Sequence, residues 1–166
     1  LIDCAGLRLQ EATDALAAFG TMYMKQTMAS GVIPQITAIF GTCGGGLALV
    51  PALTDFTFME SKKAKLFLNS PNTIDGNYDS KLDTAAADFQ SREVGKVDFG
   101  GSEAEIAAGI RQLVSMLPSN NVEEAMDECS DDPNRLCEGI EGAAGDTAIA
   151  LAMIADNNDF VEVRKN

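Results

Sequence analysis

A β-branched, apolar run that passes directly into a glycine-rich stretch constrains the fold of this chain more than any other feature. The run covers residues 32–40, and residues 41–46 (GTCGGG) follow it without a break. Such a run favours a buried strand, in which Pro34 is tolerated near the start. Residues 47–53 then favour a short helix. The order strand, tight turn, helix is typical of α/β proteins.

A second unit of the same kind stands at the beginning of the chain. Residues 1–3 are typical of a strand end, residues 4–6 of a turn, and residues 8–29 show helical spacing of apolar side chains. Because Leu1 already lies on a strand end, we expect the chain to be an excerpt of a longer polypeptide. The side chains that show this spacing, in alternating steps of three and four, are Leu9, Ala12, Leu16, Phe19 and Tyr23.

The remaining elements are predicted from local signals. Residues 56–59 and 64–68 favour short strands, and residues 82–90 favour a helix. A capping-box sequence at Ser102 opens a further helix that Pro118 stops.

The C-terminal part of the chain is more polar. Residues 118–137 have the composition of an acidic surface linker. A final helix is expected over residues 140–155, and residues 160–163 alternate like the start of a strand.

Charge is distributed unevenly along the chain. Residues 1–69 carry five acidic and five basic side chains, whereas residues 70–166 carry the whole net charge of −13. So acidic a surface argues against a nucleic-acid partner. The longest apolar run, residues 46–53, is far too short to span a bilayer, and four cysteines without metal-ligand spacing favour reduced thiols in a cytoplasmic protein.

The two glycine-containing turns, residues 4–6 and 41–46, have a shared chemical capacity. Small residues let a ligand approach the backbone, and a helix start offers unpaired N–H groups. Two such turns on neighbouring strands could direct two amides at one carbonyl oxygen, which is the geometry of an oxyanion hole. Taken alone, each turn is more simply explained as a place where a helix packs on its strand. Neither turn has the G-x-G-x-x-G or G-K-[ST] pattern of a phosphate loop.

Several segments resemble the motifs of one family, the biotin-dependent acyl-CoA carboxyltransferases. Residues 3–16 (DCAGLRLQEATDAL) are similar to its D-S-G-G-A-R-[IL]-Q-E-x-x-x-x-L segment, and residues 29–36 to its A-S-G-x-I-P-Q-I. Residues 41–56 resemble its G-x-C-A-G-G and P-A-L-x-D-F. Residues 117–121 and 156–163 resemble its S-x-L-P-S-N-N and D-x-x-x-F-F-E-V. The resemblance covers the whole chain, in order and at matching intervals.

The resemblance implies a fold and a domain organisation. The family has a crotonase/ClpP-like layered spiral of ββα units. Residues 1–117 would form part of the N-terminal carboxyltransferase domain. Residues 118–166 would be an acidic linker and helix that lead to a second, similar domain absent from this chain.

The resemblance also implies a site and a reaction. The carbonyl of a coenzyme A thioester would lie against backbone amides of Ala5 or Gly6 and of Gly44 or Gly45. These amides would hold the enolate that forms as the carboxyl group leaves for biotin N1. Biotin would be carried by a partner subunit, its pocket would lie in the absent domain, and no side-chain base would be needed. This agrees with a chain that contains no histidine.

Within the family, the chain looks most like the α subunit of glutaconyl-CoA decarboxylase. Residues 69–74 and 91–98 depart from the T-G-P-x-V-V stretch and from the histidine and S-G-V-A stretch of the propionyl-CoA and methylmalonyl-CoA enzymes. Residues 62–67 and 75–78 fit the glutaconyl branch. The implied partners are a biotin carrier subunit, a membrane decarboxylase subunit of a sodium pump and further copies of the chain. The implied location is the cytoplasm, with peripheral attachment to the membrane through those partners.

Four alternatives stay open at this point. A carboxyltransferase subunit for methylmalonyl-CoA or propionyl-CoA would share these motifs. A crotonase-type hydratase or isomerase would share the fold but adds glutamates that move protons. A ClpP-like serine peptidase would need a histidine, and a scaffold subunit would lack thioester binding.

Other side chains are better explained by structure than by chemistry. For Arg8, an ion pair with Glu11 or Asp14 is favoured over a substrate carboxylate. The three lysines near residue 63 are more typical of a solvated strand edge than of a phosphate site. They are Lys62, Lys63 and Lys65. We expect Cys4 and Cys43 to be small buried residues, and Cys129 and Cys137 to be linker thiols.

Overall fold

The computed structural model describes residues 1–77, 81–124 and 130–164. The chain divides into two compact units, residues 1–125 with 164–166 and residues 126–163. None of the helices in the described ranges is both long enough and apolar enough to cross a membrane. The expected domain assignment of residues 1–117 and 118–166 stays a prediction.

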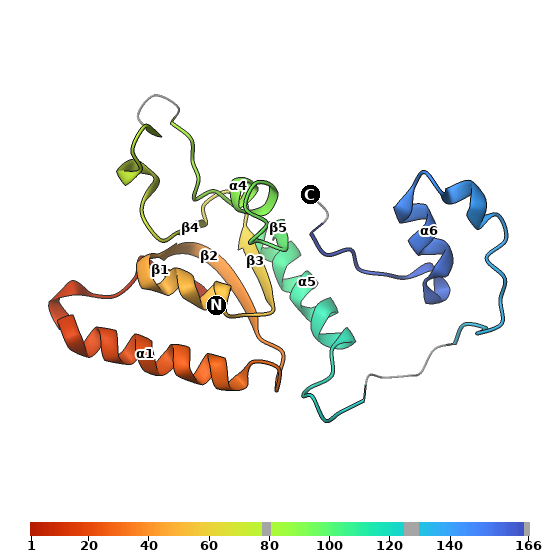
Figure 1. Ribbon diagram of the computed structural model, residues 1–166, viewed down its shortest axis with the longest axis horizontal. Coiled ribbons are helices and arrows are strands. Elements are labelled where there is room, and N and C mark those ends of the chain that lie inside the picture. Colours follow the sequence, from red (N-terminus) through yellow and green to blue (C-terminus); the bar gives the residue numbers. More distant parts are fainter. Residues whose placement is uncertain (78–80, 125–129, 165–166) are drawn as a thin grey trace. The chain divides into compact units, whose positions relative to one another are not determined.

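The first unit is built on a parallel β-sheet, as Figure 1 shows. Its strands are β1 (Ile2–Cys4), β2 (Ile36–Gly44), β3 (Phe56–Glu60), β4 (Lys65–Phe67) and β5 (Phe99–Gly101). The order is β1-β2-β3-β5, with β4 paired to the end of β2. Every strand pair in the described sheet is parallel, so the predicted α/β class is confirmed.

Strand β2 changes partner along its length. Ile36–Ile39 pair with β3, whereas Thr42–Gly44 pair with β4. The strand therefore does not end at residue 40, as the sequence predicts, because β4 offers the glycine-rich stretch a hydrogen-bonding edge as far as Gly44.

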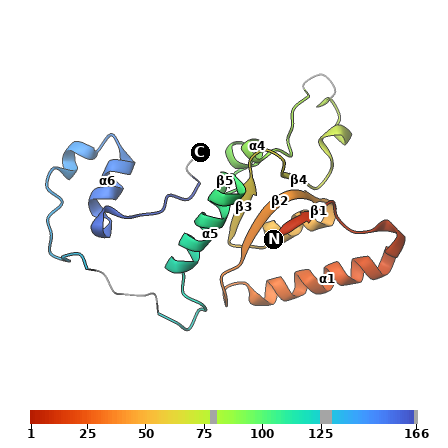
Figure 2. The same ribbon diagram turned by 180° about the vertical axis from the view of Figure 1, so that it is seen from behind.

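Short and long helices connect these strands, as Figures 1 and 2 show. The described helices of this unit are η1 (Leu9–Glu11), α1 (Ala12–Ala29), η2 (Gly45–Ala48), α2 (Leu49–Ala52), η3 (Pro71–Thr73), α4 (Ala87–Arg92) and α5 (Glu103–Met116). The predicted helices over residues 8–29 and 47–53 are confirmed. The helix expected over residues 82–90 is shorter and lies further along the chain, as α4 (Ala87–Arg92).

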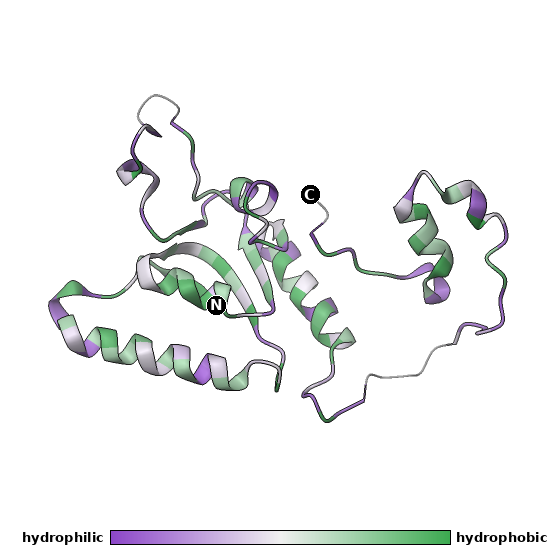
Figure 3. Ribbon diagram, in the orientation of Figure 1, coloured by the Kyte–Doolittle hydropathy of each residue, from purple (hydrophilic) through white to green (hydrophobic). Residues whose placement is uncertain are grey.

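Alternation along β2 and β3 gives the sheet two apolar faces. Ile39 and Met59 belong to one buried cluster, against which Leu47 and Val50 of η2 and α2 pack. The residues one position earlier, Ala38 and Phe58, face the opposite way and join Ile106 and Leu113 of α5. Figure 3 shows both strands as hydrophobic along most of their length. A period of two on strands that are buried on both sides is what a parallel sheet requires.

Helix α5 follows its sequence signals closely. The Ser102 hydroxyl accepts a bond from the Glu105 amide, and the Glu105 carboxylate accepts one from the Ser102 amide, so the capping box is complete. Gly109 lets the helix approach the sheet, since a Cβ there would lie 3.1 Å from the Phe58 ring. Phe58 in turn stacks on Phe99 with ring centroids 4.5 Å apart.

The apolar side chains of the first helix are only partly covered. Leu9 is 81% exposed and Leu16 60% exposed, and within α1 only Ala15 is buried. The helix touches the rest of the unit through a few side chains near α2.

The second unit is small and is held by one arginine. It contains η4 (Ile140–Ala143), α6 (Thr147–Ile154) and η5 (Asp156–Asn158). Arg135 donates to the carbonyls of Met153 and Ala155 at 2.6 and 2.7 Å and pairs with Asp131. The helix expected over residues 140–155 is thus interrupted before Thr147. No strand forms over residues 160–163, so that prediction was wrong.

Glu60 organises the turn between β3 and β4. Its buried carboxylate accepts the amides of Lys63 and Lys62 at 2.7 and 3.0 Å. These backbone hydrogen bonds, that from Lys63 first, lower the pKa of Glu60. The turn places β4 beside the end of β2.

Replacement of Glu60 by glutamine should destabilise the protein in a pH-dependent way. A lowered folded-state pKa means that the ionised carboxylate stabilises the fold above its unfolded pKa, and that this stability is lost as pH falls through the folded pKa. At pH 7, Glu60→Gln should lower Tm by about 2–4 °C, the effect of losing one ordinary hydrogen bond in a domain of 150–250 residues. The difference should vanish in acid. Glu11→Gln, which removes only an exposed ion pair with Arg8, is the control and should change Tm little at any pH.

Candidate active site

Parallel pairing of β1 and β2 brings the two glycine-containing turns into direct contact. Cys4 is aligned with Cys43, so the residues that follow each cysteine meet at the same end of the sheet. A Cβ placed on Gly6 would lie 2.9 Å from the Gly44 carbonyl oxygen. A Cβ on Gly44 would lie 2.7 Å from the Ala5 carbonyl oxygen. Such close backbone contact leaves room only for glycine at both positions.

The four predicted site residues differ in accessibility. Ala5 is exposed, Gly6 and Gly45 are partly buried, and Gly44 is buried. Gly45 has φ +60° and opens the 3-10 helix η2, and open space surrounds the position of its missing Cβ. The first residues of a helix leave N–H groups unpaired. Among the backbone hydrogen bonds outside the described helices and strands, none is donated by the amides of Ala5, Gly6 or Gly45, whereas Gly44 belongs to β2 and is paired with Phe67 of β4.

Asp3 fixes the approach to the second turn. Its carboxylate accepts the Thr42 amide at 3.1 Å. A Cβ on Gly41 would lie 1.9 Å from the same oxygen, so Gly41 is required for this contact. No role was predicted for Asp3 from the sequence, although an aspartate at a strand end opposite a glycine can indicate a hydrogen bond between the two strands.

Helix α1 supports the glycine-rich turn from the other side. The Tyr23 hydroxyl donates to the Gly46 carbonyl, and Gln26 Nε2 donates to the Val50 carbonyl at 3.4 Å. Phe19 packs against the Tyr23 ring edge to face, with centroids 5.8 Å apart. Burial raises the pKa of Tyr23, so its hydroxyl stays protonated and able to donate. The sequence pattern identified Tyr23 only as a core position and did not predict this contact.

The cysteines near the turns differ from each other. Cys43 is fully buried, as expected, and its burial, together with the proximity of Cys4, raises its pKa to about 11. Cys4 is exposed, with its thiol directed at the Gly6 carbonyl at 3.2 Å, so the expectation of a buried Cys4 was wrong. β1 lies at the sheet edge, where a side chain is left uncovered. Cys137 is partly buried and donates to the Met153 carbonyl, and Cys129 lies outside the described residues.

The charged side chains near the site form ion pairs. Arg8 pairs with Glu11 at 3.2 Å, as predicted. On the strand edge, Lys63 pairs with Glu103 and Lys65 with Asp83. These exposed pairs contribute little stability, but they keep the two lysine side chains on the protein surface.

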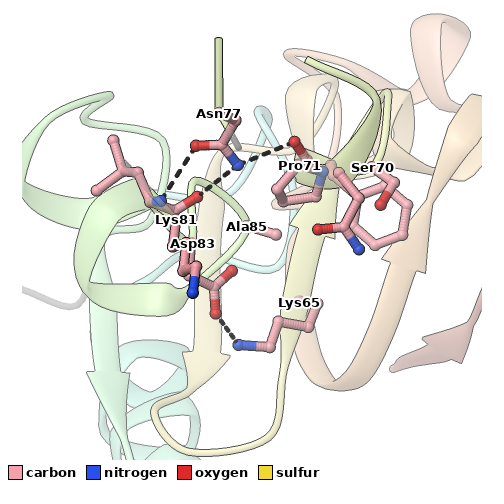
Figure 4. A pocket seen from close by; sticks show the side chains of 10 residues that line it. Lys65, Ser70, Pro71, Asn77, Lys81, Asp83 and Ala85 are labelled. Carbon is pink, nitrogen blue, oxygen red and sulfur yellow. Dashed lines mark hydrogen bonds and ion pairs between the residues drawn. The ribbon is translucent and has the colours of Figure 1, made fainter. Parts of the chain in front are cut away.

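An open cavity of about 810 Å³ adjoins the second turn, and we name it the β4 hollow. It is lined by Lys65, Phe67, Ser70, Pro71, Asn72, Asn77, Lys81, Leu82, Asp83 and Ala85. Figure 4 shows its labelled side chains around one opening. Phe67 joins the hollow to the turn, since a Cβ on Gly44 would lie 2.8 Å from the Phe67 ring. The sequence analysis did not predict this cavity.

The parallel sheet, the change of partner along β2 and the paired glycine turns define an α/β domain of the crotonase type. The structure superposes on transcarboxylase 12S with a TM-score of 0.83 and 34% identity, over 98% of this chain and 34% of that one. That structure is described as a hexamer assembly with methylmalonyl-coenzyme A bound. The predicted fold class is confirmed.

The chain belongs to the carboxyl transferase domain family, which matches residues 1–166. Methylmalonyl-CoA decarboxylase subunit alpha of Veillonella parvula is 36% identical over 98% of this chain and 34% of that protein. The carboxyltransferase subunit of propionyl-CoA carboxylase from Haloferax mediterranei is 39% identical over 85% of this chain and 28% of that protein. The chain thus spans about a third of the length of these relatives. The family resemblance drawn from the motifs is confirmed.

The different environments of Cys4 and Cys43 predict selective alkylation. At pH 7.5 a thiol of pKa about 11 is ionised in roughly one molecule in three thousand, and Cys43 is also buried. Iodoacetamide should therefore label Cys4 in the folded protein and Cys43 only after unfolding, as measured by peptide mass spectrometry. Cys4→Ser should abolish the fast labelling within this domain. Labelling of Cys43 before Cys4 would contradict the arrangement of the two turns.

Proposed function

We propose that this chain is part of a carboxyltransferase that moves the carboxyl group of a coenzyme A thioester to biotin. The observation that carries the proposal is the direct contact between the turns at Gly6 and Gly44. This contact supports a site in which backbone amides of Ala5 or Gly6 and of Gly44 or Gly45 face one oxygen. Family membership supports the same reaction class over a hydratase, an isomerase or a peptidase.

The reaction needs a place for negative charge on the thioester oxygen. In methylmalonyl-CoA the bond that breaks joins the carboxyl group to the α-carbon, whereas in glutaconyl-CoA it joins the carboxyl group to the γ-carbon, which the double bond conjugates to the thioester. In either case the electron pair of the broken bond moves into the thioester, whose carbonyl oxygen becomes an enolate or dienolate oxygen. Backbone N–H donors directed at that oxygen stabilise the charge without moving a proton. Among the three glycines proposed as donors, Gly45 has the most open space around the position of its missing Cβ.

The acceptor of the carboxyl group in the proposed reaction is biotin. Biotin on a partner subunit would supply the nitrogen that takes the carboxyl group. No residue of this chain is assigned to biotin, and the pocket for it is proposed to lie in a second domain. The side chains near the turns hold the backbone rather than react, since Asp3 and Tyr23 are bonded to Thr42 and Gly46.

Two kinds of acyl group have support. The departures at residues 69–74 and 91–98 favour glutaconyl-CoA. The names of the relatives favour methylmalonyl-CoA or propionyl-CoA. Turnover of the three thioesters by the complete gene product, with free biotin as acceptor or donor, would separate these possibilities.

The proposed partners follow from the same comparison. Relatives named as decarboxylase subunit alpha support the presence of partner subunits. From the motif resemblance, we propose that these are a biotin carrier subunit and a membrane decarboxylase subunit of a sodium pump. Exposed apolar side chains on α1, including Leu16 and Met28, support contact with further copies of the chain. Sedimentation of the complete gene product would test the homo-oligomer.

Replacement of Gly45 by valine should abolish most of the activity. A branched Cβ would block the approach of the thioester, and loss of one oxyanion donor costs about 10²–10³ in rate. Turnover would be measured with the preferred thioester and free biotin, and the Tm of each variant would be measured beside its activity.

Gly31→Val is the matched control. Gly31 has φ +74° and open space around its Cβ position, so both variants suffer similar backbone strain of about 1–2 kcal/mol. Gly31→Val should keep near-normal turnover because the residue follows the C-terminal end of α1. A stably folded Gly45→Val protein with near-normal turnover would show that the proposed hole is in the wrong place.

A further inference from the structure

The β4 hollow is linked to the second turn by the side chain of Phe67. Gly44 on β2 and Phe67 on β4 are aligned partners, and the Phe67 ring lies against the Gly44 backbone. The same ring lines the hollow. A group attached to a carbonyl at Gly44 or Gly45 would therefore extend along Phe67 into this cavity.

Two polar side chains of the hollow, those of Asn77 and Lys65, already interact with other residues that line it. Asn77 donates to the carbonyls of Pro71 and Leu82 at 3.0 and 3.1 Å and accepts the Leu82 amide at 3.1 Å. Figure 4 shows Asn77 bridging the two loops. Lys65 is neutralised by Asp83. These contacts shape the hollow but leave little capacity for a ligand.

Three other side chains of the described lining form no such interactions. Among the described residues, no hydrogen bond or ion pair is recorded for the side chains of Ser70, Asn72 or Lys81, all of which line the hollow. With Lys65 paired to Asp83, Lys81 gives the lining one positive charge in excess. This is notable in a stretch, residues 70–166, where acids outnumber bases by thirteen. The lining suits a ligand with an apolar body and an anionic end.

We propose that the β4 hollow receives the carboxylated acyl group of the coenzyme A thioester and that Lys81 recognises its carboxylate. The inference rests on the proposed function, because it takes the thioester carbonyl to lie at the second turn. Phe67, Pro71 and Leu82 provide apolar contact for the acyl chain. Lys81 thereby distinguishes the carboxylated thioester from the product that has lost its carboxyl group.

Recognition of this kind has a kinetic signature. An interaction present in the bound substrate, and not strengthened in the transition state, lowers KM without raising kcat. Loss of the Lys81 charge should therefore raise KM for the carboxylated thioester and leave kcat within about twofold. A hydrogen bond to a charged group sets the scale at roughly tenfold in affinity.

The test measures binding of thioesters that differ only in the carboxyl group. Calorimetric titration of the complete gene product, without biotin, would compare methylmalonyl-CoA with propionyl-CoA and glutaconyl-CoA with crotonyl-CoA. Lys81→Met should weaken binding of the carboxylated member that the protein prefers by about tenfold and of its partner by less than twofold. Lys62→Met, an exposed lysine outside the hollow, should change neither.

Filling the hollow provides a second, independent variant. Leu82→Trp should weaken binding of both members of a pair, whereas Leu68→Trp, on an exposed side chain that does not line the hollow, should not. If Leu82→Trp did not weaken binding, the acyl group would lie elsewhere and the inference would be overturned.

The other outcomes of the binding test distinguish failure of this inference from failure of the proposed function. Equal weakening of both thioesters by Lys81→Met would show that Lys81 meets the phosphates of coenzyme A, and would overturn the inference. No change in either would do the same. A wild-type protein that binds no thioester at all would instead refute the proposed function.

Discussion

The direct contact between the backbones at Gly6 and Gly44 is the constraint on which the site depends. It exists because β1 and β2 are parallel neighbours with Cys4 opposite Cys43. In a parallel sheet, corresponding ends of neighbouring strands lie at the same edge, so both turns emerge there together. A side chain at either glycine would force the turns apart. The requirement for glycine is therefore a requirement of the site as a whole and not of one loop.

The surroundings of the turns explain how a backbone site can be rigid. Asp3 is bonded across to the Thr42 amide, and Tyr23 holds the Gly46 carbonyl from the helix that follows the first turn. The same helix thus begins at one turn and supports the other. Electrostatic stabilisation by amides depends on donors that are fixed before the reaction begins. Side chains that hold peptide groups in place can serve such a reaction without taking or giving a proton.

Local sequence signals predicted the elements whose causes are local. The capping box at Ser102, the stop at Pro118 and the strand leading to the glycine stretch all appear where expected, within a few residues. Strand β5 (Phe99–Gly101) was missed because two of its three residues are glycine, which has little strand preference, and pairing with β3 decides its conformation. The extension of β2 to Gly44 was missed because it depends on pairing with β4.

The candidate site was predictable only in part, for a related reason. The small residues in each turn are visible in the sequence, and the motif resemblance supplied a role for them. Their contact, the bond from Tyr23 and the exposure of Cys4 depend on which strands become neighbours and which edge is left open. Helical spacing could likewise show that α1 has an apolar face, but not that the described chain would leave Leu16 exposed. Periodicity identifies a face, and only the tertiary arrangement decides what covers it.

The distribution of charge adds a constraint on where an anionic substrate can bind. Coenzyme A thioesters carry several negative charges, and residues 70–166 carry an excess of thirteen acids. Residues 1–69, which supply both turns, are neutral overall. At physiological ionic strength the Debye length is about 8 Å, so distant acidic side chains act weakly on a ligand and those near it act strongly. The pairing of Asp83 with Lys65 matters for this reason, because it offsets the negative charge among the described lining residues and leaves Lys81 as their excess positive charge.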